Sequence, residues 1–187
     1  MTKIIELETE RLKLRQWKES DYPAFSELNA DSEVMAYFPK TMSRAESDEM
    51  ADKIKSLISE RGWGLWAVEE KKSARFIGFV GLHKPIPELP FSPCVEIGWR
   101  LAKEYWGKGY ATEASKEVLT FAFSSLNLAR VYSFTSVGNL RSRAVMERLN
   151  MINTNKNFEH PEVPVGNPLR EHVLYELTKE RWHATLI

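Results

Sequence analysis

The sequence predicts an α/β (α+β) protein in which helices flank one mixed sheet. Two patterns carry this prediction. Strands follow one another closely between residues 64 and 101, whereas strand and helix alternate between residues 95 and 149. Consecutive strands pair antiparallel, and a strand–helix–strand passage brings the chain back parallel to its start. We therefore expect a mostly antiparallel sheet with one parallel pair, and a ligand site where that pair separates.

The first half of the chain supplies three strands and two helices. Glu10–Trp17 alternates apolar and polar residues, which is the period of a half-buried strand. Glu19–Asn29 carries apolar residues at helical spacing. A second helix begins at the capping box Ser43–Glu46 and ends at Gly62. Residues 64–82 then form two strands joined by a polar turn, as in a hairpin.

The second half continues from a loop at Lys84–Pro93, which holds four of the nine prolines. The expected elements after it are, in order, a strand at 95–101, a helix from Gly109 to Phe123, a strand at 129–137, a helix at 139–149, a strand at Met151–Phe158, a loop at 160–169 and a strand at 171–178. No repeat, linker or low-complexity segment interrupts this order. Residues 1–187 are therefore expected to form a single domain.

Composition limits the function classes. Lys and Arg together number 26, as do Asp and Glu, so the zero net charge argues against a nucleic-acid partner. The single cysteine forms no internal disulfide, and four scattered histidines do not favour a metal site. The charged N-terminus is unlike a signal peptide, and no stretch approaches 18 apolar residues. We expect a cytoplasmic protein without a membrane partner.

The stretch Trp106–Ala114 is the feature around which the rest is organised. A strand pattern precedes it, a helix pattern follows it, and Gly107 and Gly109 lie between them. Glycines allow unusual backbone angles and close approach, and the first turn of a helix offers unpaired N–H groups and partial positive charge. Such a turn favours a bound phosphate, while the alternative is a helix cap without a ligand.

Four motifs in the same order resemble the GNAT superfamily of acyl-CoA-dependent N-acyltransferases, and within it the RimJ/RimL-type group. They are Glu8–Arg15, Glu96–Trp99, Trp106–Ala114 and Asn139–Leu149. The likeness covers nearly the whole chain. It implies a GNAT-like sheet of seven strands with one splayed parallel pair, and acetyl-CoA as co-substrate without a metal. It leaves a homodimer open as an assembly.

The resemblance assigns acetyl-CoA to particular positions. The main chain of Trp99, Arg100 and Leu101 is expected to pair with the pantetheine arm, and Asn139 and Ser142 lie beside it. Asn139 also satisfies a purely N-capping role. The pyrophosphate is expected at the backbone of the turn, which comprises Trp106, Gly107, Lys108, Gly109, Tyr110, Ala111 and Thr112. Lys108 either adds charge there or is solvated.

Acetyl transfer requires a neutral amine, because a protonated amine has no lone pair with which to attack. A general base should therefore take a proton. Glu96 is opposite in pleat to Val95 and Ile97, which points it away from the core, although a cross-strand salt bridge is the alternative. His160 has the more suitable ordinary pKa, with a turn-holding role as its alternative. Ser142 is the candidate acid for the departing sulfur.

The acceptor is left open by the sequence. Tyr37 and Phe38, between the first two helices, are the best candidates for substrate contact, and Glu159 is a further one. The leading hypothesis is an acetyl-CoA-dependent N-acetyltransferase that acts by direct attack on a ternary complex. Its acceptor is a protein N-terminal α-amine or a small amine. The alternative is a CoA-binding sensor or scaffold domain without catalysis.

Overall fold

A computed structural model describes residues 2–185. These residues form one mixed sheet of nine strands with the order β1-β2-β3-β4-β5-β6-β9-β7, and β8 pairs with β9. The strands are β1 Leu7–Glu8, β2 Leu12–Arg15, β3 Leu65–Glu70, β4 Arg75–His83, β5 Glu96–Leu101, β6 Arg130–Ser136, β7 Ile152–Asn153, β8 Phe158–Glu159 and β9 Glu171–Thr178. The α-helices are α1 Tyr22–Ala30, α2 Arg44–Arg61, α3 Tyr110–Ser124, α4 Leu140–Arg148 and α5 Lys179–Ala184.

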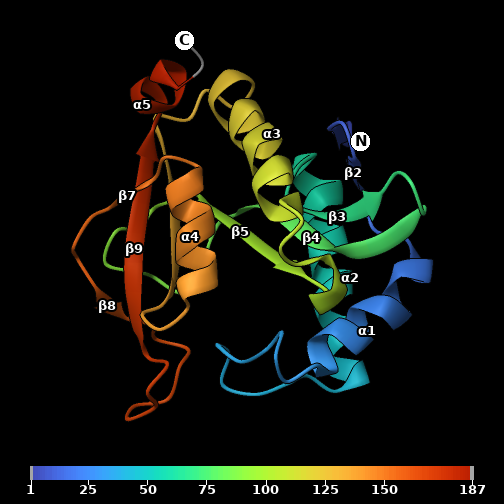
Figure 1. Cartoon of the computed structure of the whole chain (residues 1–187), viewed down its shortest axis with the longest axis horizontal. Coiled ribbons are helices and arrows are strands. Elements are labelled where there is room, and N and C mark those ends of the chain that lie inside the picture. Colours follow the sequence, from blue (N-terminus) through green and yellow to red (C-terminus); the bar gives the residue numbers. More distant parts are fainter. Residues whose placement is uncertain (1, 186–187) are drawn as a thin grey trace.

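The sheet divides between β5 and β6, its only parallel neighbours among residues 2–185. The two strands pair at one position, Glu96 opposite Tyr132, and then diverge (Figure 1). The N–H of Tyr132 donates to the Val95 carbonyl, and the Ser133 hydroxyl donates to the Ile97 carbonyl. Because no backbone pairing follows, the edge of β5 from Gly98 onward is left free toward β6. The predicted parallel pair and its separation are confirmed.

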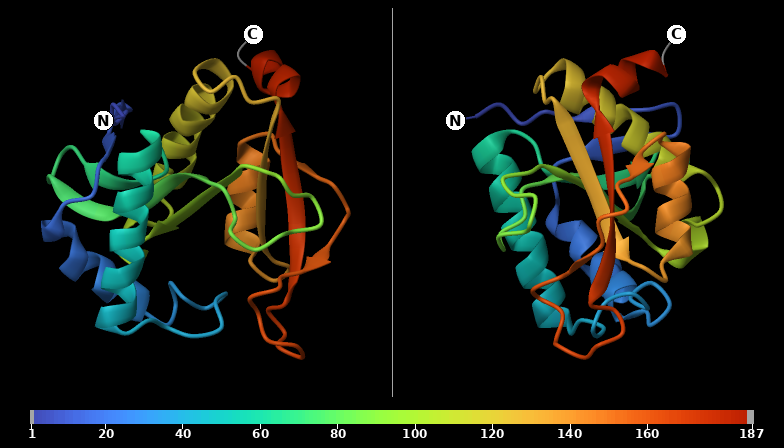
Figure 2. Two further views of the ribbon diagram at one scale, coloured as in Figure 1. Left: turned by 180° about the vertical axis from the view of Figure 1, so that it is seen from behind. Right: turned by 90° about the vertical axis from the view of Figure 1, so that its left-hand side faces the viewer.

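Helices cover the sheet on both faces. α2 lies in front of the β2–β5 half in the left view of Figure 2, with α3 behind it. Apolar residues of α3 and β5, including Val118 and Ile97, are fully buried in one core. The Ser43 hydroxyl accepts a hydrogen bond from the N–H of Glu46, and Gly62 ends α2 in the left-handed conformation. These caps confirm the predicted bounds of this helix.

The predicted strand at Met151–Phe158 is wrong in extent. Two short strands, β7 and β8, pair with β9 there. The segment between them leaves the sheet at Thr154, whose N–H donates to the Leu174 carbonyl, and Asn155 takes a left-handed conformation. Such a residue cannot continue a strand. This break and the short β1 raise the strand count from the expected seven to nine.

The loop between β4 and β5 is held by an aromatic cluster. Phe91 packs on Tyr132, Phe134 and Phe158 at centroid distances of 5.1–5.8 Å. The proline-rich segment thereby covers part of the β6–β9 half. No helix among residues 2–185 is long and apolar enough to cross a membrane.

Candidate active site

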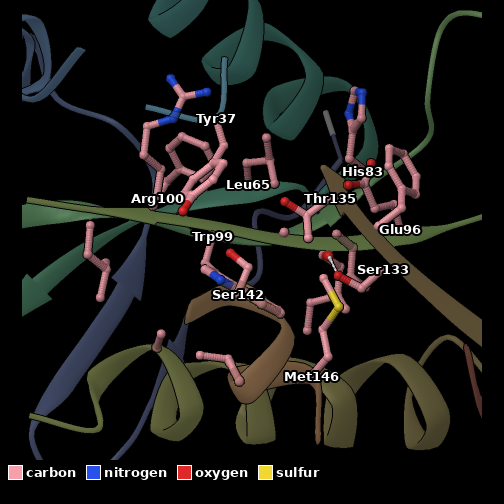
Figure 3. A pocket seen from close by; sticks show the side chains of 18 of the residues that line it. Tyr37, Leu65, His83, Glu96, Trp99, Arg100, Ser133, Thr135, Ser142 and Met146 are labelled. Carbon is pink, nitrogen blue, oxygen red and sulfur yellow. Dashed lines mark hydrogen bonds between the residues drawn. The ribbon is translucent and has the colours of Figure 1, made fainter. Parts of the chain in front are cut away.

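One cavity of about 1400 Å³ passes through the gap between β5 and β6. Side chains of both faces line it (Figure 3): Tyr37, Arg100 and His83 lie on one side of β5, whereas Trp99, Ser142 and Met146 lie on the other. Successive residues of a strand point to opposite faces, so β5 itself contributes to both sides. The cavity therefore has two ends, which different molecules can enter from opposite faces of the sheet.

The end beside α3 is lined by the glycine turn. Gly107 and Gly109 have φ values of +71° and +79°, which an L-residue adopts only with strain. The N–H of Glu113 donates to the Gly109 carbonyl, which begins α3. None of the six N–H groups from Gly107 to Thr112 donates to a residue of 2–185. This array of free donors at a helix N-terminus suits an anion.

Side chains around the turn hold its shape. The indole N–H of Trp106 donates to the Leu101 carbonyl at 2.9 Å, and the Arg141 guanidinium stacks on the Trp106 ring at 3.8 Å. Arg11 lies over the Tyr110 ring and forms an ion pair with Glu113. The predicted residue Lys108 is exposed and does not line the cavity; its Nζ lies 5.2 Å from a tyrosine ring.

The first turn of α4 contributes Ser142, but Asn139 is turned into the cap. The Asn139 carbonyl oxygen accepts from the N–H of Ser142, and its amide donates to the hydroxyls of Thr135 and Ser142. This arrangement is the capping role that the sequence allowed. Asn139 does not line the cavity, whereas Ser142 and Thr135 do.

Glu96 lies at the fork itself, and its carboxyl group forms no hydrogen bond to a residue of 2–185. Burial raises the pKa of this carboxyl from its ordinary 4.5 to about 8. His83 is directly opposite it on β4, so both side chains share a face of the sheet. Burial lowers the pKa of His83, and the nearby Arg61 and Lys53 lower it further. A carboxyl group that titrates near pH 8 suits a general base in a cleft.

The predicted residue His160 also faces the cavity. Its ring lies 4.9 Å from that of His172, and both rings stack against Phe134. Burial lowers the pKa of His160, and lowers that of His172 to about 4, so both rings are neutral at pH 7. The neighbouring Glu159 points to solvent, forms an ion pair with Arg170 at 3.0 Å and does not line the cavity.

The segment between α1 and α2 closes the cavity opposite α4. Tyr37 is half-buried and approaches the β6–α4 turn, where a Cβ on Gly138 would lie 3.7 Å from its ring. Phe38 is 41% exposed and stacks on the Arg100 guanidinium at 4.3 Å. Both predicted aromatic residues line the same cavity as Glu96.

Several lining residues were not predicted as site residues. His83 lies on β4, His172 lies on β9, and Arg61 lies at the end of α2. Only tertiary packing brings these three residues into the site. The β4–β5 register, which places His83 opposite Glu96, carries no local signal in the sequence. The side chain of Arg100 was also missed, because only its main chain was considered.

Comparison with known proteins shows the family of this chain. Residues 11–152 match the family described as "Acetyltransferase (GNAT) domain". The uncharacterized N-acetyltransferase YnaD of Bacillus subtilis (strain 168) is 28% identical over 176 residues, which cover 94% of this chain and 98% of YnaD. The crystal structure of a GNAT-family acetyltransferase from Bacillus anthracis superposes with a TM-score of 0.78 at 26% identity, covering 94% and 99% of the two chains.

A RimL-type structure has the same fold. RimL, described as a ribosomal L7/L12 alpha-N-protein acetyltransferase in complex with coenzyme A, superposes with a TM-score of 0.73 over 95% of this chain and 99% of RimL. At 18% identity this likeness shows the fold alone. The family match covers most of the chain, and the chain belongs to the GNAT acetyltransferase family. It is an acetyl-CoA-dependent acyltransferase, a class that acts on amine acceptors.

Proposed function

We propose that this protein transfers the acetyl group of acetyl-CoA to a primary amine by direct attack within a ternary complex. The observation that carries the proposal is the cavity through the β5–β6 fork. It has free N–H donors at one end and a carboxyl group of raised pKa, Glu96, at the division of the sheet. Donor and acceptor would enter from opposite faces and meet at the fork.

The donor is proposed to lie along the α3 and α4 side. The N–H groups from Gly107 to Thr112 would bind its pyrophosphate, since none of them donates to a described acceptor. The free edge of β5 at Trp99–Leu101 would pair with the pantetheine amides as an added strand. Ser142 would lie beside the sulfur, whereas Asn139 would act by fixing the start of α4.

The proposed chemistry needs one proton acceptor. The amine nitrogen attacks the thioester carbonyl carbon, the C–N bond forms, the C–S bond breaks and the amine proton passes to Glu96 directly or through water. The thiolate, with an ordinary thiol pKa near 8.5, leaves or takes a proton from Ser142. His160 is the second candidate base, because its ring is neutral and borders the same cavity.

A direct assay tests the proposal. Purified protein would be incubated with acetyl-CoA and a panel of primary amines, including N-terminal peptides, and thiol release would be followed. Turnover that depends on an amine, with sequential rather than ping-pong kinetics, is the expected result. Tight CoA binding without turnover on any amine would instead support a sensor or scaffold domain.

A further inference from the structure

Arg100 is a buried cation without a buried anion. Its side chain rises from the face of β5 that also carries Glu96, and the residue is only 9% exposed. No ion pair joins its guanidinium to a residue of 2–185, and burial lowers its pKa to about 10 with no carboxylate to offset the effect. Buried charges in proteins are normally paired, because desolvation costs several kcal/mol per ion.

The contacts of Arg100 leave part of the guanidinium unused. Its Nη1 donates to the side-chain oxygen Oδ1 of Asn29 at 2.7 Å, and the side-chain amide nitrogen of Asn29 donates to the Ser47 hydroxyl. The rings of Phe38 and Phe79 flank the guanidinium. Its Nε is buried without a partner, while Nη2 donates to no described residue and is not fully enclosed. The residue lines the cavity, so a molecule there can reach Nη2.

We propose that the acceptor amine carries a carboxylate, which pairs with the Arg100 guanidinium through Nη2. This inference rests on the proposed function and names the substrate class for the same cavity. A carboxylate would supply the missing counter-charge and form charge-assisted hydrogen bonds with the guanidinium. The acceptor would then be bound at two points, its amine at the fork and its carboxylate beside α2.

The charges around this end of the cavity agree with an anionic group. Lys53 and Arg61, on the face of α2 toward the cavity, both lie near enough to lower the pKa of His83, and Glu162 opposes them. Together with Arg100, these residues place three lysine or arginine side chains at the end of the cavity where the acceptor is proposed to bind. Two carboxyl groups, those of Glu96 and Glu162, lie at the same end. A polyamine, with several positive charges, is therefore a poor fit.

The spacing along β5 sets the shape of the acceptor. Glu96 and Arg100 are four residues apart on one face, which corresponds to roughly 13 Å between their Cα atoms. Gly98 lies between them, and a Cβ there would meet only the Glu96 carboxyl, at 3.8 Å. The floor between the two charged residues is bare. This geometry favours an amine and a carboxylate several bonds apart over an α-amino acid.

Matched acceptors test the inference. Thiol release from acetyl-CoA would be measured with ε-aminocaproate and with pentylamine, which lacks only the carboxylate, and with glycine and spermidine. We expect kcat/KM for ε-aminocaproate to exceed that for each of the other three by about tenfold or more. A peptide with aspartate near its N-terminus, compared with its asparagine counterpart, would show whether the carboxylate comes from a peptide instead. Equal rates within both matched pairs would overturn the proposal.

Two substitutions separate recognition from a structural role. Arg100→Met should remove at least about tenfold of the preference for the carboxylate-bearing member of each pair, measured as the ratio of the two rates in the same variant. Asn29→Asp keeps the arginine but places a carboxylate beside it. The preference for the carboxylate-bearing acceptor should therefore also fall, although the fold gains an ion pair. A structural arginine would lower the rates for both members alike, which contradicts the proposal. Arg130→Met, at an exposed pair with Glu176, is the control.

A binding measurement keeps the two proposals distinguishable. If the wild-type protein binds CoA but acetylates no amine, the proposed function fails while the recognition of carboxylate is still open to test. In that case ε-aminocaproate should raise the melting temperature of the CoA-bound protein more than pentylamine does, and Asn29→Asp should abolish the difference. No difference in the wild-type protein would reject the carboxylate site as well.

Discussion

The two ends of the cavity are built in different ways. At the end beside α3, the proposed donor end, six consecutive backbone N–H groups from Gly107 to Thr112 lie in one short stretch, held by two left-handed glycines and the start of α3. At the opposite end, the proposed acceptor end, Tyr37, His83, Arg100 and His160 come from separate segments of the chain. The donor end is a product of local backbone conformation, whereas the acceptor end is a product of packing.

This contrast predicts how each end responds to substitution. Backbone donors do not depend on which side chains accompany them, so the donor end should tolerate side-chain changes unless the backbone or its access is altered. Side-chain recognition depends on every residue that fixes the orientation of the group. The acceptor end should therefore respond to changes at residues that never touch a substrate.

The largest effect is expected at the glycine turn. Gly109→Glu places bulk and negative charge over the N–H groups, so CoA should bind about 100-fold more weakly or worse, equivalent to ~2.7 kcal/mol. Titration calorimetry with CoA would measure it. Gly166→Glu is the control, because that glycine has the similar φ of +82° in a loop outside the cavity. An unaltered CoA affinity in Gly109→Glu would remove the turn from the site.

Glu96→Gln should have the next largest effect, on rate rather than on CoA binding. A general base contributes about 100-fold or more, so kcat should fall by that order. Because the carboxylate forms only as pH rises toward a pKa of about 8, the wild-type rate should increase through this range and the variant should lose that limb. The pH–rate profile of kcat/KM is the measurement. The companion His160→Ala should retain the limb, and the reverse pattern would move the base to His160.

The same carboxyl group links stability to pH. Its folded-state pKa is raised, so the protonated form is favoured by folding, and its contribution to stability is complete below about pH 4.5 and is lost as pH rises through about 8. Glu96→Gln should therefore unfold in denaturant with a smaller decline between pH 5 and 8 than the wild-type protein. If the free energy of unfolding declined in parallel in the two proteins, folding would not raise the pKa of Glu96.

Asn29→Ala should produce a moderate effect confined to the acceptor end. The substitution removes the oxygen that accepts from Arg100 and the amide that donates to Ser47, which leaves a buried donor unsatisfied. A loss of about 1–3 kcal/mol is expected, or a fall in melting temperature of about 2–4 °C per kcal/mol. CoA affinity, measured by calorimetry, should stay within about twofold. A large loss of CoA affinity would show that the two ends are coupled.

Lys108→Ala should have the smallest effect. The side chain is exposed, lies against Tyr105 and does not line the cavity, so it adds only a screened charge near the turn. CoA affinity should change by less than about threefold at physiological salt. A tenfold loss, decreasing as salt is raised, would assign Lys108 a direct role beside the backbone donors.

Local patterns were enough to predict much of the fold and the glycine turn before α3. The capping box at Ser43, the glycine at the end of α2 and the alternation of Glu171–Thr178 are encoded within a few residues, and each is found where it was expected. The free N–H groups of the turn follow from glycines placed before a helix. The strand over 151–158 was overestimated because residue types alone do not reveal that Asn155 is left-handed.

The acceptor end was decided by tertiary structure. Tyr37, Glu96 and His160 could be proposed singly from residue type, but the register of β4 on β5 places His83 opposite Glu96, and the docking of α1 and α2 surrounds Arg100. Burial then raises the pKa of Glu96 and lowers that of His83. The burial of both groups is a property of the folded chain. The sequence by itself determined the sheet class and the glycine turn before α3, because both depend on neighbours along the chain. The folded structure decided which charges share the cavity and which of them lack a partner, because those depend on neighbours in space.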